Sequence, residues 1–212
     1  MTDPRIAPGK RSDVGWVNWV IAGVAGRAAG TTPPNLLLTL GRHRRLFRRW
    51  LRFAGGLMPG GRLPRKETEL VILRVAHLCG SDYEFEHHVR LGRKAGLRDE
   101  DFERVRLAVD EGGWSERVAA MLKAVDGLHA ARDLDDETWA ALRRHLGERE
   151  CIELLLLAGH YEMLATFLET LRVPKDIPRK TNLDHEAGRE SAVEQQPVAD
   201  ANNSHDGTQQ SR

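Results

Sequence analysis

Apolar residues recur at helical spacing over most of this 212-residue chain, and the alternating pattern of a β-strand is nearly absent. Residues that commonly end helices, such as Gly80, Gly96 and Pro174, separate the apolar runs. This pattern predicts an all-α fold. The expected helices cover residues 14–24, 35–57 with a bend near Gly41, 64–80, 81–96, 99–109, 115–130, 135–147 and 148–171. Among the expected N-cap residues are Asp99, Ser115 and either Asp135 or Asp136.

The composition changes near residue 177. Residues 178–212 contain no aromatic residue and almost no large apolar ones, so burial in this segment cannot offset the entropy lost on ordering. We therefore predict a disordered polar tail over 177–212. It follows a single all-α domain over 12–176, which is long enough to bury a sizeable core, and a flexible N-terminus over 1–11.

Charge and cysteine content argue against several classes of protein. The net charge of +1 gives no general attraction to nucleic acid or anionic lipid. The basic run 42–52 is interleaved with apolar residues, so we interpret it as a solvated or subunit-contact helix face. The apolar stretch from Val14 to Val24 is shorter than the roughly 20 residues of a membrane span, and its tryptophans Trp16 and Trp19 share a face of a packed helix. No nucleic-acid or membrane partner is expected.

Two cysteines, Cys79 and Cys151, are too few for a disulfide framework, so a reducing cytoplasm is the expected compartment. We interpret both as buried small apolar residues. The pair Glu84-x-x-His87 matches half of a di-iron carboxylate motif, but the nearest second half, Asp126-x-x-His129, has the wrong carboxylate. Neither a metal nor a cofactor is therefore expected.

The segment 63–97 carries the residues with the clearest chemistry. Ser81, Glu84 and His88 stand at i, i+3 and i+7 and so share one helical face. Glu84 and His88 can hydrogen-bond as an i, i+4 pair, and a carboxylate that orients an imidazole favours a general base. Glu69 has apolar neighbours on the preceding helix, where desolvation disfavours its charged form. Spacing alone does not decide whether Glu69 faces His88.

Each of these residues also has a structural interpretation, which the spacing leaves open. Ser81 and Glu84 form the pattern of a helix capping box. Glu69 can pair with Arg65 or Lys66 as a solvated helix pair, and His88 can be a hydrogen-bonded structural histidine. His87 is expected to be exposed or at an interface.

The motifs of this segment resemble those of the carboxymuconolactone decarboxylase-like family, which includes alkylhydroperoxidase D (AhpD). The matching runs are Glu69-Leu70-Val71-Ile72-Leu73-Arg74, Gly80-Ser81-Asp82-Tyr83-Glu84-Phe85, His88 and Ala95-Gly96-Leu97, with Phe85 where Trp is usual. The resemblance implies an AhpD-like helical bundle that forms a homo-oligomer, with sites near subunit contacts and a small-molecule substrate.

The redox branch of the family has a Cys-x-x-Cys pair, whose positions fall here on Ser81 and Glu84. Thiol–disulfide chemistry needs an attacking and a resolving thiol, so an AhpD-like peroxidase is disfavoured. We expect a cofactor-free acid/base enzyme, a lyase or isomerase acting on a small organic acid or lactone. His88 would be the base, Glu84 would orient it, Glu69 would be a second acid/base, and Tyr83 would position the substrate beside Ser81. The other alternative is a non-catalytic oligomeric binding protein.

Overall fold

Helices account for nearly all regular structure in the computed structural model of the chain, which describes residues 3–179. Within that range the β-type pairing is a single isolated bridge between Thr31 and Pro178, so the predicted all-α fold is confirmed. The elements are α1 (Arg11–Val14), α2 (Trp16–Ala29), α3 (Asn35–Leu40), α4 (Arg44–Leu57), α5 (Arg65–Leu78), α6 (Asp82–Lys94), α7 (Asp99–Arg104), the 3₁₀ turn η1 (Val109–Glu111), α8 (Glu116–Ala131), α9 (Asp136–His145) and α10 (Glu148–Leu171).

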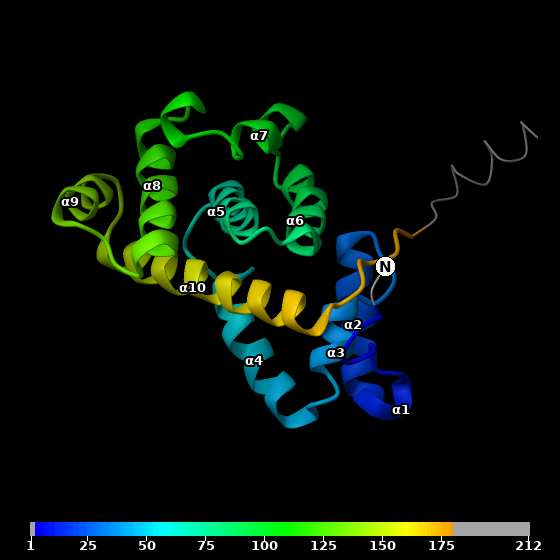
Figure 1. Ribbon diagram of the computed structural model, residues 1–212. Helices are drawn as coiled ribbons and strands as arrows, with labels where there is room; N and C mark the ends of the chain where they lie inside the picture. The colour runs from blue at the N-terminus through cyan, green and yellow to red at the C-terminus, as the bar shows by residue number, and fades with distance from the viewer. Residues whose placement is uncertain (1–2, 180–212) are drawn as a thin grey trace, which may run out of the picture. The chain divides into compact units, whose positions relative to one another are not determined.

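Helix α5 is the central helix of the domain. Every residue from 68 to 76 is buried, and α6, α8 and α10 pack around it. Figure 1 looks nearly along its axis, with these three helices on different sides. Arg74 lies inside this buried run and donates to both carboxylate oxygens of Asp126 at 2.6 and 2.7 Å. It also donates to the carbonyl oxygens of Val105 and Leu107, so its charge and hydrogen bonds are compensated.

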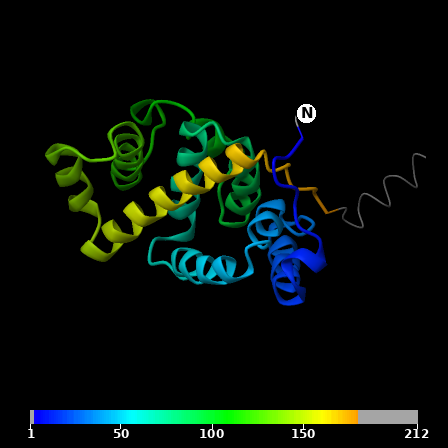
Figure 2. The same ribbon diagram turned by 60° about the horizontal axis from the view of Figure 1, so that its bottom comes forward.

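Different parts of the long helix α10 contact different helices. It packs against α8 and α9 near its start and against α4 further on, as both views show (Figures 1 and 2). By length and composition α10 could cross a membrane, but 56% of its apolar window is buried inside the protein. A core helix of a globular protein has the same character. The burial of α10 positions His160 and Tyr161 toward the site described below.

Several helix ends follow local signals in the chain. The side chain of Ser115 accepts a hydrogen bond from the N–H of Val118, and Asp135 accepts one from Thr138, so both predicted N-caps are confirmed. Gly96 follows α6 with φ +90°, the left-handed conformation expected of a terminating glycine. The predicted cap at Asp99 is wrong.

The residue at that N-cap is Arg98. Its backbone N–H donates to the carboxylate of Asp101, and α7 ends at Arg104 rather than near residue 109. The prediction that Trp16 and Trp19 share a packed helix face is correct only for Trp19. Trp19 packs against a buried cluster, whereas Trp16 at the start of α2 is 68% exposed.

The segments outside the first and last helices contact the domain. The N–H of Arg5 donates to the carbonyl oxygen of Leu171, and that of Gly9 donates to Leu38. After α10, the carbonyl oxygen of Ile177 accepts from the N–H of Thr32. These contacts lie partly outside the domain limits of 12 and 176 expected from composition, and the compact unit extends to residue 178. The predicted disordered tail lies, from residue 180 onward, outside the described residues.

Candidate functional site

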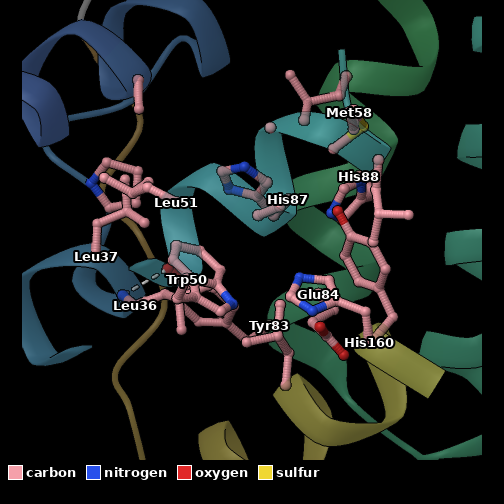
Figure 3. A pocket seen from close by; sticks show the side chains of 18 residues that line it. Leu36, Leu37, Trp50, Leu51, Met58, Tyr83, Glu84, His87, His88 and His160 are labelled. Atoms are coloured by element: carbon pink, nitrogen blue, oxygen red, sulfur yellow. Dashed lines mark hydrogen bonds between the residues drawn. The ribbon is translucent and has the colours of Figure 1, made fainter. Parts of the chain in front are cut away.

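A cavity of about 260 Å³ lies between α3, α4, α6 and α10. Most of its wall is apolar, and its polar side chains come chiefly from one side of α6 and from α10 (Figure 3). The titratable residues that line it are Tyr83, Glu84, His87, His88, His160 and Tyr161. No lysine or arginine of the described residues belongs to this lining.

His88 and Glu69 form a buried dyad at this cavity. Nδ1 of His88 lies 2.7 Å from Oε2 of Glu69, and the two side chains are 5% and 0% exposed. Because a carboxylate accepts, Nδ1 carries the proton and the lone pair stays on Nε2. Burial lowers the pKa of His88 and outweighs the hydrogen bond that His88 donates to Glu69, which raises it. His88 is therefore a neutral imidazole at neutral pH.

Glu69 is held from its other side by Arg65, whose Nη2 lies 2.7 Å from Oε1. The predicted i, i+4 pairing with Arg65 is thus present. It is not a solvated pair, however, because Glu69 is fully buried within α5. The carboxylate therefore bridges a guanidinium and an imidazole, which fixes the orientation of the His88 ring.

Glu84 is the second buried acid of the site, and it does not orient His88 as predicted. Within the described chain, neither of its carboxyl oxygens has a hydrogen-bond partner, and the residue is only 2% exposed. Burial raises its pKa from 4.5 to about 8, against a smaller lowering effect of the nearby Ser81 hydroxyl. Glu84 is therefore mainly protonated at neutral pH and can donate a proton into the cavity.

The predicted capping box at the start of α6 does not form. Ser81 is the N-cap residue, but its side chain makes no capping hydrogen bond. Its hydroxyl is near enough to influence Glu84 without forming a hydrogen bond of standard geometry. Ser81 and Glu84 therefore do not cap α6, and the carboxyl of Glu84 is instead buried beside the cavity.

A second histidine of the cavity, His87, is oriented by a carboxylate that sequence reasoning missed. Its Nδ1 lies 3.0 Å from Oδ2 of Asp176, in the segment after α10. The hydroxyl of Tyr83 donates to Oδ1 of Asp176 at 2.6 Å, and the N–H of Asn35 donates to the same atom at 2.8 Å. Burial alone would raise the pKa of Asp176, but these three hydrogen bonds lower it. His87 is therefore partly buried rather than exposed, and its alternative position at an interface stays a prediction.

Several buried polar atoms that face this region have no partner in the described part of the protein. They include Nε1 of Trp50 and Nδ1 of His160, whose rings stack with their centroids 5.8 Å apart. Burial lowers the pKa of His160 to about 4, so this ring is uncharged at neutral pH. With the carboxyl of Glu84, these atoms are free to bind a polar group of a ligand or water.

The five predicted site residues thus gather at one place with different roles. Tyr83, Glu84 and His88 line the cavity, while Glu69 lies behind His88 and Ser81 lies beside Glu84. The hydroxyl of Tyr83 is already engaged, because it donates to Asp176 and accepts from the N–H of Leu36. Neither cysteine lines the cavity; Cys151 is buried as expected, whereas Cys79 is only partly buried.

Comparison with known proteins bears on the family and the fold. Residues 44–127, which run from α4 into α8 and include the motif helices, match the carboxymuconolactone decarboxylase family. Among curated proteins no match is found. The fold is shared with an uncharacterized peroxidase-related protein from Silicibacter sp. TM1040, with TM-score 0.71, 15% identity, and 82% of this chain and 94% of that chain covered.

Two further solved structures have the same fold. One is a peroxidase-related protein from Ralstonia eutropha JMP134, described as an alkylhydroperoxidase AhpD core, with TM-score 0.67, 17% identity and 82% and 94% of the two chains covered. The other is a cysteine-to-alanine variant of the debrominase Bmp8 in complex with 2,3,4-tribromopyrrole, with TM-score 0.68, 16% identity and 87% and 98% covered. The segment 44–127, which includes α5 and α6, is thus similar to the carboxymuconolactone decarboxylase family, and the whole helical domain shares its fold with these solved structures.

Proposed function

We propose that this protein is a cofactor-free acid/base enzyme that moves a proton within a small, neutral lactone or enol substrate. The observation that carries the proposal is Glu84, a buried carboxyl group on the cavity wall with a pKa raised to about 8. It stands one helical turn from His88, whose pKa is lowered by burial. Neighbouring groups whose environments push their pKa values in opposite directions commonly act as an acid and base pair.

The roles follow from the protonation states at neutral pH. Neutral His88 would accept a proton from a carbon next to a carbonyl group through Nε2, while Glu69 stabilises the resulting imidazolium through Nδ1. Protonated Glu84 would deliver a proton to the substrate oxygen or to another carbon. One proton leaves and one arrives, so an isomerisation needs no redox partner and balances within the site.

The charge of the cavity restricts the substrate. An anionic substrate would find no lysine or arginine among the described residues of the lining, and Asp176 already engages Nδ1 of His87. A charge taken into an apolar site without a partner is strongly disfavoured. We therefore favour a neutral lactone over an organic acid. Decarboxylation is the less favoured variant of the same chemistry, because it starts from a carboxylate.

The proposal can be tested by proton exchange without knowing the full reaction. The protein is incubated in D₂O with a panel of neutral lactones and enones, and exchange at the carbon next to the carbonyl group is followed by NMR. Glu84→Gln and His88→Gln should lower the exchange rate by about 10²–10⁴-fold, the usual contribution of a general acid or base. Glu86→Gln, at an exposed residue of the same helix whose carboxylate pairs with Lys175, is the matched control and should keep the rate.

The outcomes separate the proposed enzyme from a binding protein. If both cavity variants exchange as fast as the unmodified chain, the assigned acid and base are wrong. If the unmodified chain binds lactones but exchanges none of their protons, the non-catalytic binding protein is the better description. Exchange lost only in the two cavity variants supports the enzyme.

The pH dependence gives an independent prediction. The rate should fall as pH drops below the lowered pKa of His88, because the base becomes protonated, and should fall above about 8, because Glu84 loses its proton. We expect a plateau that includes pH 7. Glu84→Gln removes the acid. The residual rate of this variant should therefore no longer decline on the alkaline side. A rate that rises steadily through pH 9 would contradict these roles.

A thiol-dependent peroxidase is the second candidate, since two of the similar structures carry peroxidase-related names. The cavity argues against it, because Ser81 and Glu84 stand at the thiol positions and no cysteine lines the wall. Peroxide reduction with a dithiol should therefore stay at background, and Cys79→Ser should leave proton exchange unchanged. The two free cysteines also suit the reducing cytoplasm that we propose as the compartment.

A further inference from the structure

Away from the cavity wall, three side chains with metal-binding atoms meet where α5, α8 and α10 come together. They are Cys79 at the end of α5, His129 in α8 and Glu162 in α10, and their ligand atoms all lie within 4.8 Å of one another. All three residues are partly buried, so the group is shielded yet reachable from solvent. The proposed acid/base reaction uses none of them.

The distances are close to those of a metal site. Sγ of Cys79 lies 3.9 Å from Nδ1 of His129, and the same Nδ1 lies 2.9 Å from Oε1 of Glu162. Typical zinc bonds of about 2.0–2.3 Å at tetrahedral angles would place these atom pairs about 3.6 and about 3.4 Å apart. For these two pairs, side-chain shifts of a few tenths of an ångström would suffice. The sulfur of Cys79 and the carboxylate oxygen of Glu162 lie within 4.8 Å of each other and would have to approach to about 3.6 Å.

The geometry does not suit a catalytic Cys–His–Glu triad. In a triad the carboxylate and the nucleophile form hydrogen bonds with different nitrogens of the imidazole. Here the sulfur and the carboxylate oxygen both approach Nδ1 of His129. Convergence of three ligand atoms on one point is what coordination of a single ion requires.

The donor types select the class of ion. A thiolate with an imidazole favours zinc and related transition metals, whereas calcium and magnesium require oxygen ligands. A thiolate and a carboxylate bring two negative charges to a divalent cation, although the carboxylate also pairs with Arg132. The second oxygen of Glu162 is held by Arg132, which orients the carboxylate as partners of metal ligands commonly do.

We propose that Cys79, His129 and Glu162 bind one zinc-class divalent metal ion, with a fourth position open to water. The ion would join the end of the central helix α5 to α8 and α10. The sequence pattern could not reveal this site, because its ligands lie 50 and 33 residues apart and the pattern that includes His129 pairs it with Asp126.

Cobalt(II) titration of the metal-free 212-residue chain tests the proposal. We expect one saturable site with the visible absorption of a tetrahedral ion and a sulfur-to-cobalt charge-transfer band, both displaced by Zn²⁺. Cys79→Ser should abolish the charge-transfer band, and His129→Gln should weaken binding by more than about 100-fold, because even residues that only orient a ligand change metal affinity by about 10–100-fold. Cys151→Ser is the matched control and should retain the complete spectrum.

Other outcomes overturn the proposal. A charge-transfer band that persists in Cys79→Ser, or the absence of any saturable binding, would remove the site. Binding that is lost in His87→Gln but kept in Cys79→Ser would place the ion in the cavity instead. Should Cys79→Ser or His129→Gln not fold, Glu162→Gln provides the second measurement, and unchanged zinc affinity in that variant would equally contradict the assignment.

Discussion

Glu84 links the stability of the fold to pH. A carboxyl group whose pKa is about 8 in the folded state and 4.5 in a solvated reference binds its proton more tightly when folded. The stabilisation from the protonated form is complete below about 4.5 and is lost as pH rises through about 8. Burial of this acid therefore opposes folding in alkaline solution.

The variant Glu84→Gln should remove this penalty. Glutamine has nearly the same shape and does not ionise, so the two proteins should have similar melting temperatures near pH 5. At pH 9 the variant should be more stable, by at most on the order of 5 kcal/mol, which corresponds to roughly 10 °C or more for a domain of this size. Melting curves from pH 5 to 9 measure the difference, with Glu86→Gln as the exposed control. A variant that melts below the unmodified chain at pH 9 would show that Glu84 is ionised and compensated.

At the scale of single elements, α6 begins without the hydrogen bond that its sequence pattern predicts. Ser81 makes no capping hydrogen bond, whereas Asp135 accepts one from Thr138 at the start of α9, at 2.7 Å. A residue of a type that favours the N-cap position thus caps α9 but not α6. At α6 the acid three residues after the cap is buried at the cavity instead of turning back to the backbone.

The substitution Ser81→Ala should therefore change stability little, by less than about 0.5 kcal/mol. The matched change Asp135→Ala removes a capping hydrogen bond and should cost about 1 kcal/mol. Chemical denaturation of both variants gives the two values. A loss in Ser81→Ala as large as that in Asp135→Ala would indicate that Ser81 caps α6 in solution.

Helix starts and ends were predictable from the sequence where nearby residues determine them, whereas the candidate site was predictable only in part. Helix starts at Ser115 and Asp135 and the end at Gly96 depend on residues within one turn, so the pattern alone located them. The partners of His88 and His87 lie 19 and 89 residues away, and only packing brings them together. Side-chain pairing across helices depends on helix rotation, which apolar spacing does not define to within one residue.

For the whole molecule, we expect the domain to end with the segment 173–178. A chain shortened to end at Lys180 should melt at the same temperature as the full chain. A chain that ends at Arg172 loses buried Val173 and the hydrogen bonds of Asp176, and its melting temperature should fall by roughly 5–15 °C. A fall of several degrees on removal of residues 181–212 alone would show that the tail packs against the domain.

We also expect a homo-oligomer, and α10 offers an apolar surface for one. Ile152, Leu156 and Met163 lie on one face of this helix and are 58%, 48% and 50% exposed. Leu156→Glu should shift the mass measured by light scattering to that of a monomer. Leu107→Glu, at another exposed leucine, should not. A full-length chain that is monomeric at all concentrations would contradict the expectation.

The anchoring of His87 by Asp176 has a consequence for how heat inactivates the protein. The segment that carries Asp176 is short and held mainly by hydrogen bonds, so it can open locally at a lower free energy than separation of the packed helices. Its opening would release the ring of His87 and the hydroxyl of Tyr83 together while α5 stays enclosed. Ligand affinity should therefore disappear a few degrees before helical circular dichroism does. A half-life measured by activity would then report the detachment of six residues rather than the lifetime of the fold.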